Sequence, residues 1–207
     1  MFKRKKQLEM TLQEIPGHPD PRAELEQYQT PSIIAADLLW NAAAIGDIEG
    51  FKVVDLGCGT GIFTLGSALM GAAESVGVDV DPGALKVAES YASKMGLEDV
   101  VRFVESDVMN FSEPADTVIQ NPPFGAQKAH AKEADRIFME KAAQTAPVVY
   151  SFHMKETEHF VEKFFNSLGM EATHRFYYSF PIPRIYDFHQ KEKVHVKVVV
   201  LRVQRKD

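Results

Sequence analysis

The chain has 207 residues, of which 45% are hydrophobic and 25% are charged, as in one ordinary globular domain. Its single cysteine, Cys58, excludes an intrachain disulfide, and no apolar run approaches the roughly 20 residues that cross a bilayer. The net charge of -6 argues against indiscriminate coating of nucleic acid, although residues 184–207 carry seven Lys or Arg against three Asp or Glu. We therefore expect a soluble, cytoplasmic protein without a membrane partner. No metal site is expected, because the histidines lack paired ligand spacing.

The order of predicted elements indicates an α/β fold. Residues 1–24 are expected to form a polar N-terminal leader and residues 25–207 a single domain. Apolar patterns predict helices at 32–44, 61–70, 82–95, 131–146 and 156–168, and strands at 52–55, 75–79, 101–104, 117–119, 148–152, 173–180 and 194–203. Alternating strands and helices predict a parallel sheet covered on both faces. The last two strands have no helix between them, which predicts a C-terminal antiparallel hairpin on a seven-stranded, Rossmann-like sheet.

A glycine-rich loop marks the predicted ligand site. The segment Asp55-Leu-Gly-Cys-Gly-Thr-Gly61 follows a Val-rich strand and opens a helix, where open parallel sheets bind ligands. Its glycines allow close approach of the backbone to a ligand. Asp79, at the end of the next strand, is placed to accept hydrogen bonds from both ribose hydroxyls. NAD binding is the rival interpretation, but Asp55 stands where a dinucleotide site normally has an apolar residue.

A second segment, Asn121-Pro-Pro-Phe-Gly125, suits methylation of an amine conjugated to a ring. Its two prolines end the strand at 117–119 and fix the backbone. Asn121 Oδ1 and the Pro122 carbonyl could each accept one N6–H of an adenine and so aim the nitrogen lone pair at a sulfonium methyl. Orientation and preorganised dipoles then replace a strong base, because the donor is already cationic. Phe124 offers a stacking face to the extruded base, and a structural turn is the alternative interpretation.

These motifs resemble those of the archaeal and eukaryotic adenine-N6 methyltransferases of small-subunit ribosomal RNA, the methyltransferase-like protein five type. The resemblance covers about Leu25 to Val203 and includes the two motifs above with Leu25–Thr30, Val78–Asp81, Ser106–Val108, Val149–His153 and Tyr186–Lys191. The glycine loop is shared by very many methyltransferases, whereas Gln-Tyr-Gln-Thr and Tyr-Asp-Phe-His are much more specific. The resemblance implies a class I methyltransferase fold, S-adenosyl-L-methionine as the cofactor and RNA as the substrate.

The resemblance also implies roles for individual residues. Gln27 and Thr30 are expected to close over the cofactor from the N-terminal side. Gly57, Thr60 and Ile62 are expected to line its methionine end, Asp79 the ribose, and Asp107 with Val108 the adenine edge. The full expected cofactor site comprises Gln27, Thr30, Asp55, Gly57, Gly59, Thr60, Gly61, Ile62, Asp79, Asp107 and Val108. The expected catalytic residues are Asn121, Pro122, Pro123 and Phe124. Family members often carry a small zinc-binding activator protein that pairs with the sheet edge, which is therefore a candidate partner.

RNA contacts are expected between the last two strands. Tyr186 and Phe188 offer stacking faces there, while Arg184, Lys191 and Lys193 offer phosphate contacts. The stretch at 183–186 differs from relatives, and Thr60 stands where eukaryotic members often have Cys.

Three other functions stay open on sequence alone. Guanine-N2 methylation of RNA and glutamine-N5 methylation of protein share the Asn-Pro-Pro-aromatic logic. Glutamine enzymes of release factors usually add an N-terminal helical domain and carry Tyr after the prolines, where this chain has Phe124. A non-catalytic RNA-binding assembly factor is the remaining alternative, and intact Asn121 and Asp79 argue against it.

Overall fold

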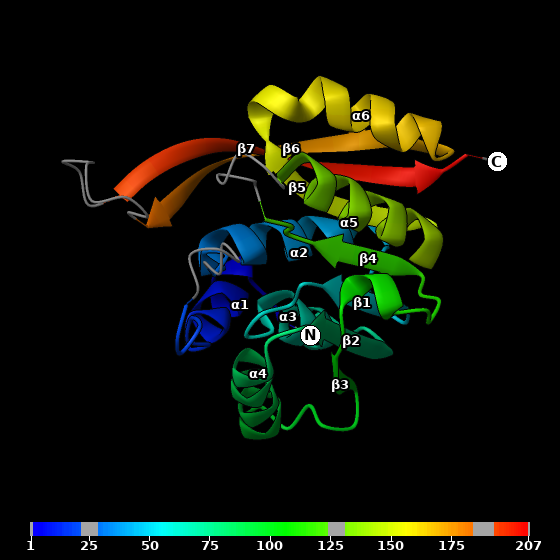
Figure 1. Ribbon diagram of the computed structural model, residues 1–207. Helices are drawn as coiled ribbons and strands as arrows, with labels where there is room; N and C mark the ends of the chain where they lie inside the picture. Colours follow the sequence, from blue (N-terminus) through cyan, green and yellow to red (C-terminus); the bar gives the residue numbers. More distant parts are fainter. Residues whose placement is uncertain (1, 22–28, 124–130, 184–192, 207) are drawn as a thin grey trace.

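The computed structural model describes residues 2–21, 29–123, 131–183 and 193–206. Seven strands form one sheet in the order β3-β2-β1-β4-β5-β7-β6 (Figure 1). Their bounds are β1 Lys52–Leu56, β2 Glu74–Asp79, β3 Val101–Glu105, β4 Thr117–Gln120, β5 Val148–Met154, β6 Met170–Pro183 and β7 Lys193–Arg205. The first five strands pair in parallel, and β7 runs antiparallel to both of its neighbours, β5 and β6. The predicted mostly parallel sheet with a C-terminal antiparallel hairpin is confirmed.

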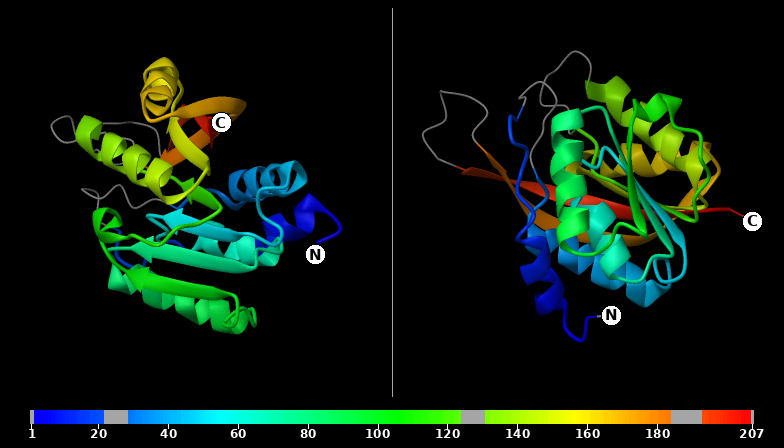
Figure 2. Two further views of the ribbon diagram at one scale, coloured as in Figure 1. Left: turned by 90° about the vertical axis from the view of Figure 1, so that its right-hand side faces the viewer. Right: turned by 90° about the horizontal axis from the view of Figure 1, so that it is seen from below.

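Helices cover both faces of the sheet (Figure 2). One face packs under α2 (Ser32–Ile45), α3 (Ile62–Leu69) and α4 (Pro82–Lys94), and the other under α5 (Ala131–Thr145) and α6 (Glu158–Ser167). Successive residues of β1 alternate between the two layers, since Val53 joins the first core and Val54 the second. Two 3₁₀ turns, η2 (Val108–Asn110) and η3 (Lys155–Thr157), complete the elements. No helix in the described part of the chain has the length and apolar character that crossing a membrane requires.

The N-terminus differs from the expected polar leader, because it contains a helix, α1 (Lys5–Leu12). Leu8 and Leu12 are fully buried and join the core under α2, and Ile15 joins it just after the helix. The spacing of four residues places Leu8 and Leu12 on one face of the helix. The segment reads as polar because only this narrow face is apolar. This helix leads the chain toward the edge of the sheet where the functional site lies.

A buried ion pair joins the loop after α2 to the C-terminal strands. Arg202 of β7 donates to Asp47 through Nε at 2.7 Å and through Nη2 at 2.9 Å. Tyr150 of β5 donates its hydroxyl to the same carboxylate at 2.5 Å. Arg202 also donates to Thr173 Oγ1 of β6 at 2.6 Å. The guanidinium thus connects the last two strands of the sheet to the layer that contains α2.

Candidate functional site

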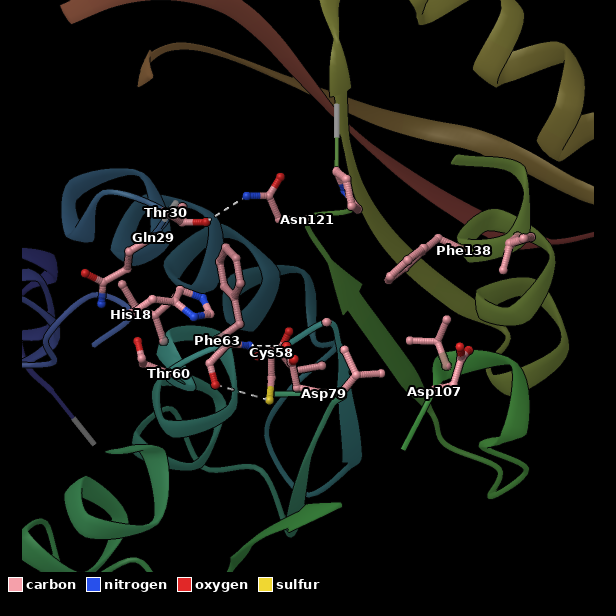
Figure 3. Close-up of a pocket in the computed structure, with 18 of the residues that line it drawn as sticks. His18, Gln29, Thr30, Cys58, Thr60, Phe63, Asp79, Asp107, Asn121 and Phe138 are labelled. Carbon is pink, nitrogen blue, oxygen red and sulfur yellow. Dashed lines mark hydrogen bonds between the residues drawn. The ribbon is translucent and has the colours of Figure 1, made fainter. Parts of the chain in front are cut away.

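A cavity of about 320 Å³ lies at the carboxyl edge of the parallel strands, where the segments after β1, β2, β3 and β4 meet (Figure 3). Motifs far apart in the sequence converge on it, as expected for an open parallel sheet. Its lining includes most of the residues predicted for the cofactor and the catalytic segment: Thr30, Asp55, Gly57, Gly59, Thr60, Ile62, Asp79, Asp107, Val108, Asn121 and Pro123. The structure therefore brings the separate sequence motifs together in one place.

Other predicted residues lie elsewhere or outside the described residues. Gly61 does not line the cavity; it precedes α3 with a φ of 85°, and a Cβ there would meet Ala88 and Phe103. Its role is to let the loop turn tightly into the helix. Pro122 is buried and is not part of the lining. The predictions for Gln27, Phe124, Arg184, Tyr186, Phe188 and Lys191, and for the side chain of Lys193, fall outside the described residues.

The glycine loop uses its own amides inside the protein. Gly57 N and Cys58 N donate to Val78 O, Gly59 N donates to Asp79 Oδ2, and Gly61 N donates to Cys58 O. These amides are therefore unavailable to cradle a phosphate. The described lining also contains no Lys or Arg, whereas it contains the carboxyl groups of Asp55, Asp79 and Asp107. Such a cavity suits a neutral or cationic nucleoside better than the diphosphate of a dinucleotide.

Asp79 is held in place by two backbone amides. Gly59 N donates to Oδ2 at 2.7 Å, and Asp81 N donates to Oδ1 at 2.9 Å. A carboxylate oxygen has two lone pairs, so each oxygen can accept a second hydrogen bond. The side chain lies at the centre of the cavity (Figure 3). This arrangement suits acceptance from the two adjacent hydroxyls of a ribose.

Asp55 lines the cavity and also caps the helix that follows the loop. Its Oδ2 accepts hydrogen bonds from Thr64 N at 3.0 Å and Thr64 Oγ1 at 2.8 Å. Thr64 is the third residue of α3, so the carboxyl group satisfies an otherwise unpaired amide of the first turn. Burial raises the pKa of Asp55 to about 7, although both Thr64 hydrogen bonds lower it. Asp55 thus fixes the loop against α3, a structural role beyond the expected cofactor contact.

The side of the cavity beyond Asp79 offers a carboxylate beside apolar surfaces. Asp107 is the N-cap of η2, and its Oδ1 accepts a hydrogen bond from Met109 N at 2.8 Å. Val108 is buried, and Phe138 of α5 lines the cavity on the same side of Asp79 as Asp107 (Figure 3). Flat apolar walls next to one acceptor suit a heteroaromatic ring that carries an amino group. This is the arrangement expected for an adenine edge.

Asn121 comes directly after β4 and is oriented by Thr30. Its Nδ2 donates to Thr30 Oγ1 at 3.1 Å, while its Oδ1 is buried and has no hydrogen-bond partner among the described residues. An unpaired buried acceptor is costly, about 1–3 kcal/mol, unless a ligand completes it. A donor of the N–H type is the partner that this oxygen lacks.

Several residues of the lining were not predicted from the sequence, namely His18, Gln29, Phe63, Val80, Met109, Ile137 and Phe138. Phe63 and Met109 directly follow predicted residues of the lining, so their positions could have been inferred from those motifs. His18, Ile137 and Phe138 belong to no motif. Cys58 also lines the cavity, but burial raises the pKa of its thiol well above the usual value, so the sulfur stays protonated. No three His, Cys, Asp or Glu side chains cluster as metal ligands in the part of the chain that the structure describes.

Comparisons with known proteins agree with this geometry. Residues 35–173 match the model of the Methyltransferase small domain family. The chain is 34% identical to the rRNA N(6)-adenosine-methyltransferase METTL5 of Danio rerio, over 95% of this chain and 97% of the relative. It is 39% identical to protein MJ0284 of Methanocaldococcus jannaschii, over 98% of this chain and 94% of the relative. The crystal structure of PH1948 from Pyrococcus horikoshii, provisionally assigned as an RNA methyltransferase, superposes with a TM-score of 0.90 at 39% identity over the whole of both chains.

Proposed function

Because this chain belongs to the METTL5 family of rRNA N(6)-adenosine-methyltransferases, we propose that it transfers a methyl group from S-adenosyl-L-methionine to N6 of an adenine in small-subunit ribosomal RNA. The observation that carries the proposal is the orientation of Asn121. Thr30 occupies the amide nitrogen and leaves Oδ1 as a buried acceptor without a partner among the described residues. An exocyclic amino group is a donor that fits this acceptor.

The residues around the cavity fit the proposed cofactor. S-adenosyl-L-methionine supplies a methyl group on a cationic sulfonium, which is already a strong electrophile. Asp79 would hold the ribose and Asp107 the adenine, each through carboxylate oxygens kept in place by backbone amides. The acidic lining, without Lys or Arg among the described residues, favours a cation. These side chains therefore bind and orient, and none of them needs to act as a strong base.

Asn121 would act on the amino group of the substrate. Its Oδ1 accepts one N–H, and the Pro122 carbonyl is proposed to accept the other, which draws the nitrogen lone pair out of conjugation with the ring. The amide is fixed before substrate arrives because Thr30 already holds Nδ2. A preorganised acceptor loses little free energy to reorientation during the reaction. Phe124 remains the proposed stacking partner of the base.

The C-terminal hairpin is the proposed RNA-binding element. β6 runs in the same direction as the parallel strands, so its end at Pro183 lies at the carboxyl edge, on the side of the cavity (Figure 1). The segment joining Pro183 to Lys193 contains Arg184, Tyr186, Phe188 and Lys191. We propose that these residues contact RNA by stacking and by phosphate pairing. A small zinc-binding activator protein and a cytoplasmic location are further parts of the proposal.

One experiment separates this function from the alternatives. The purified chain is incubated with purified small-subunit RNA and methyl-labelled S-adenosyl-L-methionine, and the RNA is digested to nucleosides. The expected product is N6-methyladenosine, and the matched Asn121→Ala variant should form little of it. N2-methylguanosine would instead identify a guanine enzyme, and label confined to added ribosomal or release-factor protein a protein methyltransferase. RNA binding without transfer, even with the activator present, would indicate an assembly factor.

A further inference from the structure

A short segment between α1 and α2 contributes one residue, His18, to the lining of the cavity. We call residues Ile15–Pro19 the strap. Its first residue is anchored in the core, since Ile15 is 2% exposed. Ile15 O accepts from Gln29 Nε2 at 2.9 Å, and Pro16 O accepts from Thr60 Oγ1 at 2.7 Å. The strap is thus bonded to the glycine loop, although its sequence is separated from that loop by about forty residues.

His18 is the strap residue that lines the cavity. Its side chain is 7% exposed, and its ring lies over Gly59, so that a Cβ on that glycine would approach Nε2 to 2.8 Å. The other ring nitrogen, Nδ1, lies 3.8 Å from Asp81 Oδ2 and has no hydrogen bond among the described residues. Burial lowers the pKa of His18, against the opposite effect of Asp79 and Asp81. The ring is therefore neutral near pH 7 and adds no positive charge beside a cationic ligand.

The position of the ring can be related to the parts of a nucleoside ligand. Asp107 is the acceptor suited to an adenine amino group, and Asp79 is the acceptor suited to a ribose. Figure 3 shows His18 and Thr60 on the other side of Asp79 from Asp107. The part of the cavity next to His18 is therefore available to a ligand that extends beyond its ribose, away from the adenine. In S-adenosyl-L-methionine, the amino-acid portion occupies that position in the covalent order.

We propose that the strap is part of the cofactor site and that the His18 ring closes the end of the cavity that holds the amino-acid portion of the cofactor. This inference rests on the proposed function, since it takes S-adenosyl-L-methionine as the ligand. It gives the segment before residue 25 a direct part in binding. The strap would contact the cofactor through one aromatic ring, with Thr60 and Gln29 holding its backbone.

The test compares two ligands that differ only beyond the ribose sulfur. S-adenosylhomocysteine carries the amino-acid portion, whereas 5′-methylthioadenosine lacks it. Titration calorimetry on the full chain should show that His18→Ala weakens S-adenosylhomocysteine binding by about tenfold, which corresponds to about 1.4 kcal/mol. Binding of 5′-methylthioadenosine should change by less than about twofold. His18→Phe keeps a flat ring and should bind S-adenosylhomocysteine within about threefold of the wild type.

Hydrogen exchange on the unmodified protein gives an independent readout that needs no variant. S-adenosylhomocysteine should slow exchange of the Gly17 and His18 amides more than 5′-methylthioadenosine does. Equal protection by both ligands, or equal loss of both affinities in His18→Ala, would overturn the assignment of the ring to the amino-acid end. Unchanged affinity of a folded His18→Ala variant would overturn it as well. If the wild type bound neither ligand, the proposed function itself would fail, which is a different result.

Discussion

The Asn121 side-chain amide donates to Thr30 Oγ1 at 3.1 Å across 91 positions of sequence. This bond joins the end of β4 to the segment that precedes α2, and it determines which end of the amide is left for a ligand. Thr30 is 4% exposed, so water competes poorly for its hydroxyl. The pair therefore links the position of the residue before Pro31 and α2 to the orientation of the group proposed to accept the substrate amine.

The first prediction concerns this pair. Thr30→Val removes the acceptor of Asn121 Nδ2 and frees the amide to rotate, so methyl transfer should fall by about tenfold, the effect of losing one hydrogen bond. Asn121→Ala should reduce the rate by about a hundredfold or more and leave the dissociation constant of the cofactor nearly intact. Single-turnover assays and calorimetry measure the two quantities separately.

The matched variant Thr30→Ser keeps the hydroxyl and should recover most of the rate lost in Thr30→Val. Should Thr30→Ser and Thr30→Val be equally slow, the hydroxyl would not be what orients Asn121. If the Asn121→Ala variant kept more than half of the methyl-transfer rate, the Asn121 amide would have no part in orienting the substrate amine.

The sequence predicts the elements that repeat a pattern and the residues that belong to a motif. The strands at 52–55 and 75–79 were predictable because apolar runs end at Asp55 and Asp79, and the structure extends them by no more than one residue at an end. The helix α1 was not predicted, because only Leu8 and Leu12 within it are buried and two positions carry little periodicity. Its structure depends on contact with α2, which no local pattern encodes.

The site follows the same division. Asp79 and Asp107 were predictable because Asp79 ends β2 and Asp107 follows β3, and the ends of parallel strands lie at the carboxyl edge of the sheet. Phe138 and His18 were not, since each reaches the cavity only through tertiary packing of its element. Gly61 belongs to a predicted motif but does not line the cavity. Its positive φ lets the glycine loop turn into α3.

A second prediction concerns Asp79. Asp79→Ala removes the acceptor for the ribose and releases the amides of Gly59 and Asp81, so cofactor binding should weaken by roughly 1–3 kcal/mol. Asp79→Asn keeps one acceptor oxygen and should lie between the alanine variant and the wild type. Calorimetry with S-adenosylhomocysteine checks both variants. Unchanged affinity in a folded Asp79→Ala protein would contradict the ribose assignment.

A third prediction concerns stability away from the cavity. Arg202→Met leaves the Asp47 carboxylate buried without its cation and should lower the free energy of unfolding by about 3–5 kcal/mol. Adding Asp47→Asn should restore part of that loss, because the uncompensated charge is removed. Arg175→Met, in a more exposed pair with Glu162, is the control and should cost less than about 1 kcal/mol. Urea unfolding followed by Trp40 fluorescence measures all three, and equal costs at both arginines would contradict the argument.

A fourth prediction concerns the hairpin. Changing Arg184, Lys191 and Lys193 together to Glu should raise the Michaelis constant for RNA and flatten its dependence on salt, because phosphate contacts release counterions. The cofactor dissociation constant should stay the same. Reversal of Lys86 and Lys94 on α4, near the opposite edge of the sheet, is the control for negative charge added away from the hairpin. An unaltered Michaelis constant in the triple variant at both low and moderate salt would mean that RNA enters by another surface.

The last prediction concerns His153, a buried histidine of β5 beside β4, the strand that precedes Asn121. His153 Nε2 lies 2.7 Å from Ser151 Oγ, which accepts from Gln120 Nε2, the residue before Asn121. Burial lowers the pKa of His153 to about 3 from its ordinary 6.5. Between these values the unfolded chain binds a proton that the folded protein does not, so stability falls as the pH drops below 6.5. From pH 7 to pH 5 the loss should be about 2 kcal/mol.

Asp55 changes stability in the opposite direction over part of this range. Its pKa is raised from 3.8 to about 7 in the folded protein. Between pH 3.8 and about pH 7 the folded protein therefore holds a proton on Asp55 that the unfolded chain has lost, and this favours folding as the pH falls. The comparison therefore uses His153→Gln, which keeps a polar group near Ser151, lacks the titration and retains Asp55. Urea unfolding should show the wild type losing about 2 kcal/mol relative to this variant between pH 7 and pH 5. If the difference in unfolding free energy between the two proteins stayed constant with pH, His153 would be able to accept a proton in the folded protein. Its ring would then be accessible to solvent, contrary to the burial beside β4.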